Sequence, residues 1–174
     1  MRFKSGAIIP ILVMLSVLFV PPLWAQDRTA DPKVLAETIL KLVSFEKHCS
    51  GESSEITVYV LGSEEVAEEL DKMIGTRVGN ATLKKVEKGT ELPDDIPDVF
   101  YIGDDTKLFS TIMFTRTQKV LSVTGLTHMA EKGVTLNIAA AEDGSPSITL
   151  NLTASKEEDL DWNPAILKIA RAVH

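Results

Sequence analysis

The sequence predicts an α/β protein: a single three-layer domain with a mixed sheet, closed by an antiparallel hairpin and a helix. Between residues 31 and 125, stretches with helical periodicity alternate with short β-branched runs, which is typical of strands joined by helical crossovers. From residue 134 onward the apolar period changes to two, as in a hairpin with one polar face. The chain has 174 residues, 44% of them apolar, which suffices for one buried core. We therefore expect one domain without internal repeats or linkers.

Residue types that begin or end helices indicate where the helices and strands lie over residues 31–123. Asp31 with Pro32 is a typical helix cap and first turn, and Ser63 can cap the next helix, which Gly75 ends. Apolar residues at three- and four-residue spacing indicate helices, and β-branched or aromatic clusters indicate strands. The predicted elements are a helix over 31–45, a strand over 56–61, a helix over 63–75, a weaker strand over 81–86, a strand over 98–102, a helix over 106–116 and a strand over 120–123.

The last third of the chain is predicted to form a hairpin and a helix. Alternating apolar residues over 134–139 and 148–152 flank Asp143-Gly144, which is a strong turn signal. An apolar stripe over 164–173 predicts a closing helix. The acidic residues over 157–161 are interpreted as a helix start or loop in solvent, and Trp162 as a packing anchor for the last helix.

The N-terminus has the pattern of a secretory signal peptide. Arg2 and Lys4 precede a mainly apolar run over 7–20, and the small residue Ala25 stands at the expected cleavage point. A membrane anchor is the alternative, but a spanning helix needs about 20 apolar residues, and prolines interrupt this run. We predict cleavage after Ala25, which leaves residues 26–174 as a soluble protein outside the cytoplasm, in the periplasm.

The charge of the mature chain excludes two classes of partner. The whole chain carries −7, and removal of residues 1–25 with their two cations and no acids leaves −9. A protein of this charge without a basic stripe is not expected to bind nucleic acid, because nothing offsets the repulsion of the phosphates. Docking on anionic lipid head groups is disfavoured for the same reason.

Ligands of open α/β sheets gather beyond the carboxyl ends of the strands, and this rule selects weak candidate ligand-binding residues. The candidates that follow predicted strands are Gly62, Ser63, Gly103, Asp104, Asp105 and Gly125. One interpretation is a pocket in which Asp104 and Asp105 hold a cation or a ligand amine. The favoured alternative is that both cap the helix that follows, where negative charge meets the positive end of the helix dipole.

The signal for catalysis in the sequence is weak. The three histidines lack metal-ligand spacing, and nucleotide-binding and serine-nucleophile motifs are absent, so we expect no enzyme, no metal and no cofactor. Cys49 follows His48 and could be a reactive thiol, but a buried side chain at a helix end is the favoured interpretation. As the only cysteine it cannot form an internal disulfide, and an intermolecular one remains open.

The order of elements over 119–173 resembles the YfiR-like family of bacterial periplasmic proteins. The segments that carry this resemblance are the strand 120–123, the run Glu131-Lys132-Gly133 before the strand 134–138, the return strand 148–152 and the closing segment 165–171. The helix around 39–45 and the strands 58–62 and 98–102 are similar more loosely. The chain departs from the family where Glu46-Lys47-His48-Cys49 replaces a Trp-Pro pair, where Lys132-Gly133 replaces a Gly-Gly pair, and in lacking paired cysteines.

This resemblance implies that residues 26–174 form a YfiR-like domain that acts as a non-catalytic periplasmic regulator. Such proteins resemble inhibitors that hold the periplasmic part of a membrane-bound diguanylate cyclase or sensor inactive, and a homodimer and an exposed apolar patch are also implied. A periplasmic small-molecule binding module that serves a sensor or transport system is the alternative, and an exported enzyme is a third, weaker one.

Overall fold

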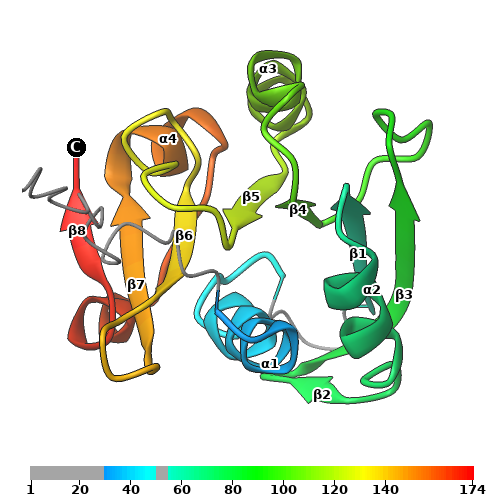
Figure 1. Cartoon of the computed structure of the whole chain (residues 1–174), viewed down its shortest axis with the longest axis horizontal. Coiled ribbons are helices and arrows are strands. Elements are labelled where there is room, and N and C mark those ends of the chain that lie inside the picture. The colour runs from blue at the N-terminus through cyan, green and yellow to red at the C-terminus, as the bar shows by residue number, and fades with distance from the viewer. Residues whose placement is uncertain (1–29, 50–54) are drawn as a thin grey trace, which may run out of the picture.

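The computed structural model describes residues 30–49 and 55–174, so the predicted signal peptide lies outside the described residues. Eight strands form one sheet in the order β2-β3-β1-β4-β5-β6-β7-β8 (Figure 1). The strands are β1 (Glu55–Leu61), β2 (Arg77–Val78), β3 (Ala81–Gly89), β4 (Val99–Ile102), β5 (Leu121–Thr124), β6 (Leu136–Ala140), β7 (Pro146–Asn151) and β8 (Arg171–Val173). The helices are α1 (Pro32–Val43), α2 (Glu64–Asp71), α3 (Leu108–Gln118), α4 (Leu152–Glu157) and the 3₁₀ helix η1 (Pro164–Lys168).

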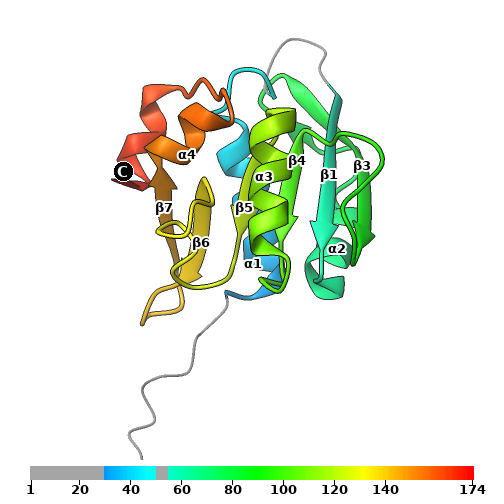
Figure 2. The same ribbon diagram turned by 90° about the horizontal axis from the view of Figure 1, so that it is seen from above.

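Helices cover both faces of the sheet, so the predicted three-layer α/β fold is confirmed. Helices α1 and α2 lie on one face, and α3 and α4 lie on the other (Figures 1 and 2). Strand β4 is buried at all four positions, and its side chains alternate between two cores. Val99 and Tyr101 pack in the core under α1 and α2, whereas Phe100 and Ile102 pack in the core under α3.

The five strands β3-β1-β4-β5-β6 are parallel and form a doubly wound sheet. Chain order reverses between β1 and β4, which is the switch point where such sheets bind ligands. The connection from β3 to β4 contains no helix. Instead, the loop over 90–98 lies against the α3 face of the sheet, where the Tyr59 hydroxyl donates a hydrogen bond to the Glu91 carbonyl oxygen at 2.6 Å.

The predicted hairpin is confirmed, but the predicted closing helix is wrong. Strands β6 and β7 pair antiparallel from Leu136↔Leu150 to Ala140↔Pro146. Over 164–173 the chain forms only the five-residue η1, and it then becomes β8, which pairs parallel with β7. The edge of β7 offers backbone partners to this segment, and a short helix with one buried side chain, Ile166, does not outweigh them. Trp162 is confirmed as a packing residue, and its ring N–H donates to the Ser155 hydroxyl at 2.7 Å.

Two helix ends also differ from the prediction. Helix α2 ends at Asp71 and not at the predicted Gly75, and Ile74, which follows the helix, is exposed. Helix α3 begins at Leu108, and neither Asp104 nor Asp105 caps it. Asp104 instead accepts a hydrogen bond from the Thr106 N–H at 2.8 Å, which forms a turn before the helix. The cap predicted at Asp31 is confirmed, since its carboxylate accepts from the N–H groups of Lys33 and Val34.

Glu158 is a buried carboxyl in a region predicted to be a solvated acidic segment. Only 1% of the residue is exposed. Its Oε2 accepts hydrogen bonds from the Ser122 N–H at 3.0 Å and the Thr135 hydroxyl at 2.7 Å, while Oε1 has no partner among the described residues. Burial raises the pKa of the Glu158 carboxyl above its ordinary value, although the bonds from Ser122 and Thr135 oppose this. The folded state therefore resists ionisation of this group.

Replacement Glu158→Gln is expected to raise the thermal unfolding midpoint at pH 7.5 by a few degrees. A pKa raised by folding means that stability is lost as pH rises from the ordinary value of the carboxyl through the folded one. The amide keeps the acceptor toward Ser122 and Thr135 and carries no charge. The gain should disappear below about pH 4, where the carboxyl is protonated in both states. Calorimetry of both proteins across this range measures the effect, and an equal gain at every pH would contradict the assignment.

Candidate functional site

The carboxyl ends of β1 and β4 bring four of the predicted ligand-binding residues together. The Gly103 N–H donates to the Leu61 carbonyl oxygen at 2.8 Å, so the two strand ends are joined directly. A Cβ atom on Gly62 would lie 2.6 Å from the Cβ of Asp104, and one on Gly103 would lie 2.6 Å from the Cβ of Ser63. Both glycines therefore make room for neighbouring protein atoms at the switch point. Ligand binding by these residues stays a prediction.

The other two candidates, Gly125 and Asp105, have separate surroundings. A Cβ atom on Gly125 would lie 2.8 Å from the Tyr101 hydroxyl oxygen and 2.9 Å from Leu35 of α1. Tyr101 is buried there, and burial raises the pKa of its hydroxyl to about 12, so it stays protonated. The Asp105 carboxylate lies 3.8 Å from the ammonium of Lys132. Asp104 and Asp105 thus have different partners, and the geometry does not make them a joint cation site.

An open hollow of about 470 Å³ lies between the carboxyl ends of β1 and β3. Gly62 and Ser63 line it on one side, and Lys88 with Gly89 lines it on the other. The Lys88 ammonium is paired with the Glu64 carboxylate across it. Because this ion pair satisfies both charges, the hollow offers an anionic or cationic ligand no unpaired partner from these two residues.

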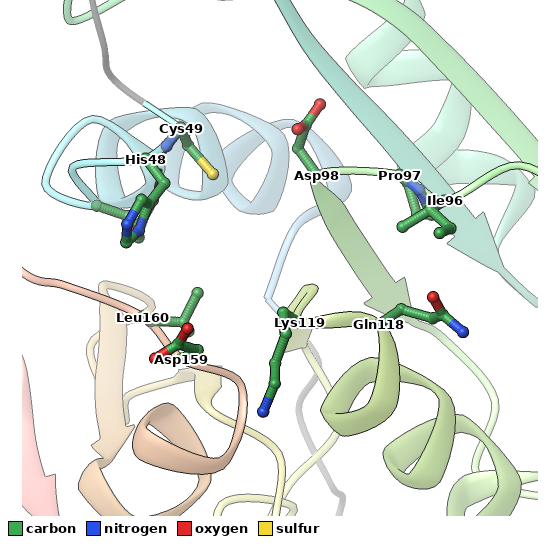
Figure 3. Close-up of a pocket in the computed structure, with 10 residues that line it drawn as sticks. His48, Cys49, Ile96, Pro97, Asp98, Gln118, Lys119, Asp159 and Leu160 are labelled. Atoms are coloured by element: carbon green, nitrogen blue, oxygen red, sulfur yellow. Dashed lines mark hydrogen bonds and ion pairs between the residues drawn. The ribbon is translucent and has the colours of Figure 1, made fainter.

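A second hollow, of about 340 Å³, lies at the opposite end of the sheet, and the sequence did not indicate it (Figure 3). Four separate segments line it: 46–49 after α1, 96–98 before β4, 118–119 before β5 and 159–160 after α4. The Asp98 carboxylate turns away to accept hydrogen bonds from the Thr57 N–H and hydroxyl, at 2.7 and 2.8 Å. Figure 3 shows the Lys119 side chain pointing away from Asp98. The Asp98 and Lys119 side chains therefore do not converge on one point.

Glu46 is the structural centre of this end of the molecule. It is fully buried, and its Oε2 accepts from the Cys49 N–H at 2.7 Å. Its Oε1 accepts from the Asp161 N–H at 3.1 Å and lies 2.9 Å from His48 Nδ1. Glu46 and Trp162 also form a β-bridge. The carboxylate thus joins the segment after α1 to the segment after α4, at the place where the sequence departs from the Trp-Pro pair.

Glu46→Ala is expected to lower the free energy of unfolding by about 3 kcal/mol, because the change leaves the buried Cys49 N–H and the partly buried Asp161 N–H without their acceptor. Urea denaturation measures the loss. Lys47→Ala is the matched control, since it removes only an exposed ion pair with Asp161 and should change the stability little. Equal losses in both variants would contradict the role of Glu46.

Cys49 is a buried thiol, as the favoured interpretation expected. Only 8% of the residue is exposed. Burial raises the pKa of the Cys49 thiol strongly, and the negative charges of Glu46 and Asp98 raise it further. The thiolate is therefore disfavoured, which argues against nucleophilic chemistry at this position. An intermolecular disulfide would require the side chain to leave this site.

The Cys49 thiol is expected to react with a maleimide at least about a hundredfold more slowly in the folded protein than in urea, because both access and thiolate formation are suppressed. Mass spectrometry of timed samples measures the rate. A free cysteine placed at the exposed position Ser110 supplies the control for an accessible thiol. Labelling of Cys49 as fast as that control would contradict the buried assignment.

Within residues 30–49 and 55–174, no cluster of His, Cys, Asp or Glu could hold a metal ion. No helix in the same described part is long and apolar enough to cross a membrane. The described residues form a three-layer α/β domain with hollows at both ends of its sheet.

The chain belongs to the YfiR/HmsC-like family (DUF4154), whose family model matches residues 32–171. The resemblance found in the sequence is confirmed by this match. A comparison with curated proteins gives no significant match.

Several solved structures share the fold, and two of them serve as examples. One is the ABC domain in complex with L-Trp from Streptococcus pneumonia, with 12% identity and a TM-score of 0.54. The other is a conserved domain protein from Vibrio cholerae, with 17% identity and a TM-score of 0.51. Each comparison covers 83% of this chain, which spans 61% and 60% of the two structures. At these identities the likeness extends to the fold alone.

Proposed function

We propose that this protein is a non-catalytic periplasmic regulator of cyclic di-GMP signalling, which binds the periplasmic part of a membrane-bound diguanylate cyclase and restrains it. The observation that carries this proposal is the family match over nearly the whole described domain, residues 32–171. The signal-peptide pattern of residues 1–25 supports export to the compartment where such a cyclase presents its sensor part.

The physical mechanism is selective binding to one conformation. A regulator that binds the inactive conformer of the sensor part more tightly shifts the population toward it by the difference in binding free energy. A coupling free energy of about 1–3 kcal/mol changes the equilibrium constant between the inactive and active conformers by about 5- to 150-fold. This mechanism needs no catalytic residue in the regulator. A stress signal or ligand that weakens the binding would release the cyclase.

Expression of the full chain in its native host is expected to lower cellular cyclic di-GMP several-fold, whereas the chain without residues 1–25 should have no effect. Both versions fold the same domain, so the comparison isolates export. Liquid chromatography with mass spectrometry measures the nucleotide. Cross-linked capture of the tagged exported chain from native envelopes should recover a membrane cyclase. Unchanged cyclic di-GMP together with recovery of the chain alone would overturn the proposal.

A small-molecule binding module remains the second candidate, and one observation favours it. The Streptococcus pneumonia domain that shares this fold holds L-Trp, and this chain has hollows at both ends of its sheet. Thermal shift with L-Trp and a metabolite library tests it. Stabilisation that Asp104→Asn abolishes would support a ligand at the switch point, because this variant keeps the acceptor for the Thr106 N–H and removes only the charge.

A further inference from the structure

Strand β3 leaves most of its outer edge unpaired in the described part of the chain. On its inner side it pairs with β1 as far as Gly89. On its outer side the short strand β2 pairs only with the first two residues of β3, and the Leu83 N–H then donates to the Thr76 carbonyl oxygen at 3.0 Å. Figures 1 and 2 both show β3 at the outer margin of the sheet. The segment 84–89 therefore has an open strand edge.

The backbone groups that point outward from this edge belong to Val86 and Lys88. Successive residues of a strand direct their backbone N–H and C=O groups to opposite sides. The Gly89 carbonyl oxygen accepts from the Gly62 N–H at 3.0 Å, so Gly89 faces β1, and Glu87 faces β1 as well. Val86 and Lys88 alternate with them and face outward, where none of the described residues bonds to their backbone. Two N–H donors and two carbonyl acceptors are thus available to a further strand.

Open hollows flank the carboxyl end of β3 on both faces of the sheet. The hollow of about 470 Å³ includes Lys88 together with Glu64 of α2, so it lies on the α2 face. A further hollow, of about 390 Å³, is lined by Glu87 and by the loop residues 92–95, so it lies on the α3 face. The side chains of an added strand alternate between the two faces. Each face therefore has space beside β3, and such space gives selectivity when a strand adds to a sheet edge.

Lysine is the main side chain of this edge. Lys84, Lys85 and Lys88 are exposed, and no other five-residue window of the sequence contains three basic residues. Their partners are carboxylates of the same chain, Glu55, Glu87 and Glu64. Ion pairs this exposed contribute little free energy, so a carboxylate from another molecule can share or replace them. The segment 84–89 carries a net charge of +2, which is complementary to an acidic segment.

We propose that the open edge over 84–89 binds an extended acidic segment of another protein, which adds to the sheet as a further strand beside β3. Backbone bonds to Val86 and Lys88 hold the segment, and its carboxylates lie opposite the lysines. A second copy of this chain is a poorer occupant. Antiparallel pairing of two β3 edges about Val86 places Lys84 of each copy opposite Lys88 of the other, and lysines on an edge strand oppose such pairing. This inference is independent of the proposed function, which requires no particular surface of the domain.

Amide hydrogen exchange in residues 26–174, followed by NMR, tests the open edge. The Val86 and Lys88 N–H groups are expected to exchange at least about tenfold faster than that of Glu87, which bonds β1. A capped synthetic peptide of alternating Glu and Val should slow exchange at Val86 and Lys88 and leave Glu87 nearly unchanged. Equal exchange at the three positions in the free protein, or no slowing by the peptide at millimolar concentration, would overturn the proposal.

A proline on the edge tests binding through the backbone. Val86→Pro removes one outward N–H, and proline is tolerated on an edge strand whose N–H faces solvent. This variant should weaken binding of the acidic peptide at least about tenfold in an NMR titration. Val86→Thr is the matched control, because it keeps the N–H and the preference for strand, and it should bind like the native protein. Unfolding midpoints establish that each variant is folded. Equal binding by the two variants places the peptide elsewhere and overturns the proposal.

Charge reversal tests the chemistry of the occupant. Lys88→Glu should weaken the acidic peptide and strengthen a peptide in which Lys replaces Glu, whereas Lys41→Glu, at an exposed position on α1, should change neither. Binding of the lysine peptide to the native protein as tightly as the acidic one would overturn the acidic class. The cyclic di-GMP measurement keeps the two proposals apart. A fall in cyclic di-GMP that Val86→Pro retains supports the regulator proposal, and the peptide measurements alone decide this one.

Discussion

The central strands of this protein are buried on both faces, and the rest of the structure depends on how each face is covered. All four residues of β4 are buried, with Val99 and Tyr101 in one core and Phe100 and Ile102 in the other. Helices α1 and α2 together cover the first face. On the second face the β3–β4 connection has no helix, so α3 and the loop over 90–98 have to exclude water from β1 and β4. Parallel sheets require such double cover.

The two buried carboxylates fix the C-terminal third of the chain to the sheet. Glu158 binds β5 through the Ser122 N–H, and Glu46 binds the Asp161 N–H from the other side. Both contacts fall on the short segment after α4, so this segment is held by polar bonds at two points. Such bonds have directional geometry, and they define where η1 and β8 lie better than apolar packing alone would. The addition of β8 to the edge of β7 follows from this placement.

The candidate ligand-binding residues at the strand ends are engaged with neighbouring protein groups. The glycines at the ends of β1 and β4 bring Ser63 and Asp104 into contact with the opposite strand end, and the ion pair between Lys88 and Glu64 spans the adjacent hollow. The exposed apolar side chains of α3 stand out against these engaged groups. Exposed apolar side chains of this kind support the binding role proposed above for this member of the YfiR/HmsC-like family.

The local sequence by itself determined the α/β class, the strands β1, β4 and β5, the β6–β7 hairpin and the family, because periodicity, caps and turn residues act over short distances. Only the tertiary structure determined the conformation of residues 164–173. The free edge of β7 provides hydrogen-bond partners for the backbone of this segment, and no local sequence pattern encodes that pairing. The tertiary structure also decided that Glu158 is buried and that Phe109 is exposed. The orientation of a helix depends on which of its faces fits the sheet, and α3, with apolar residues on both faces, carries no periodic signal to choose one.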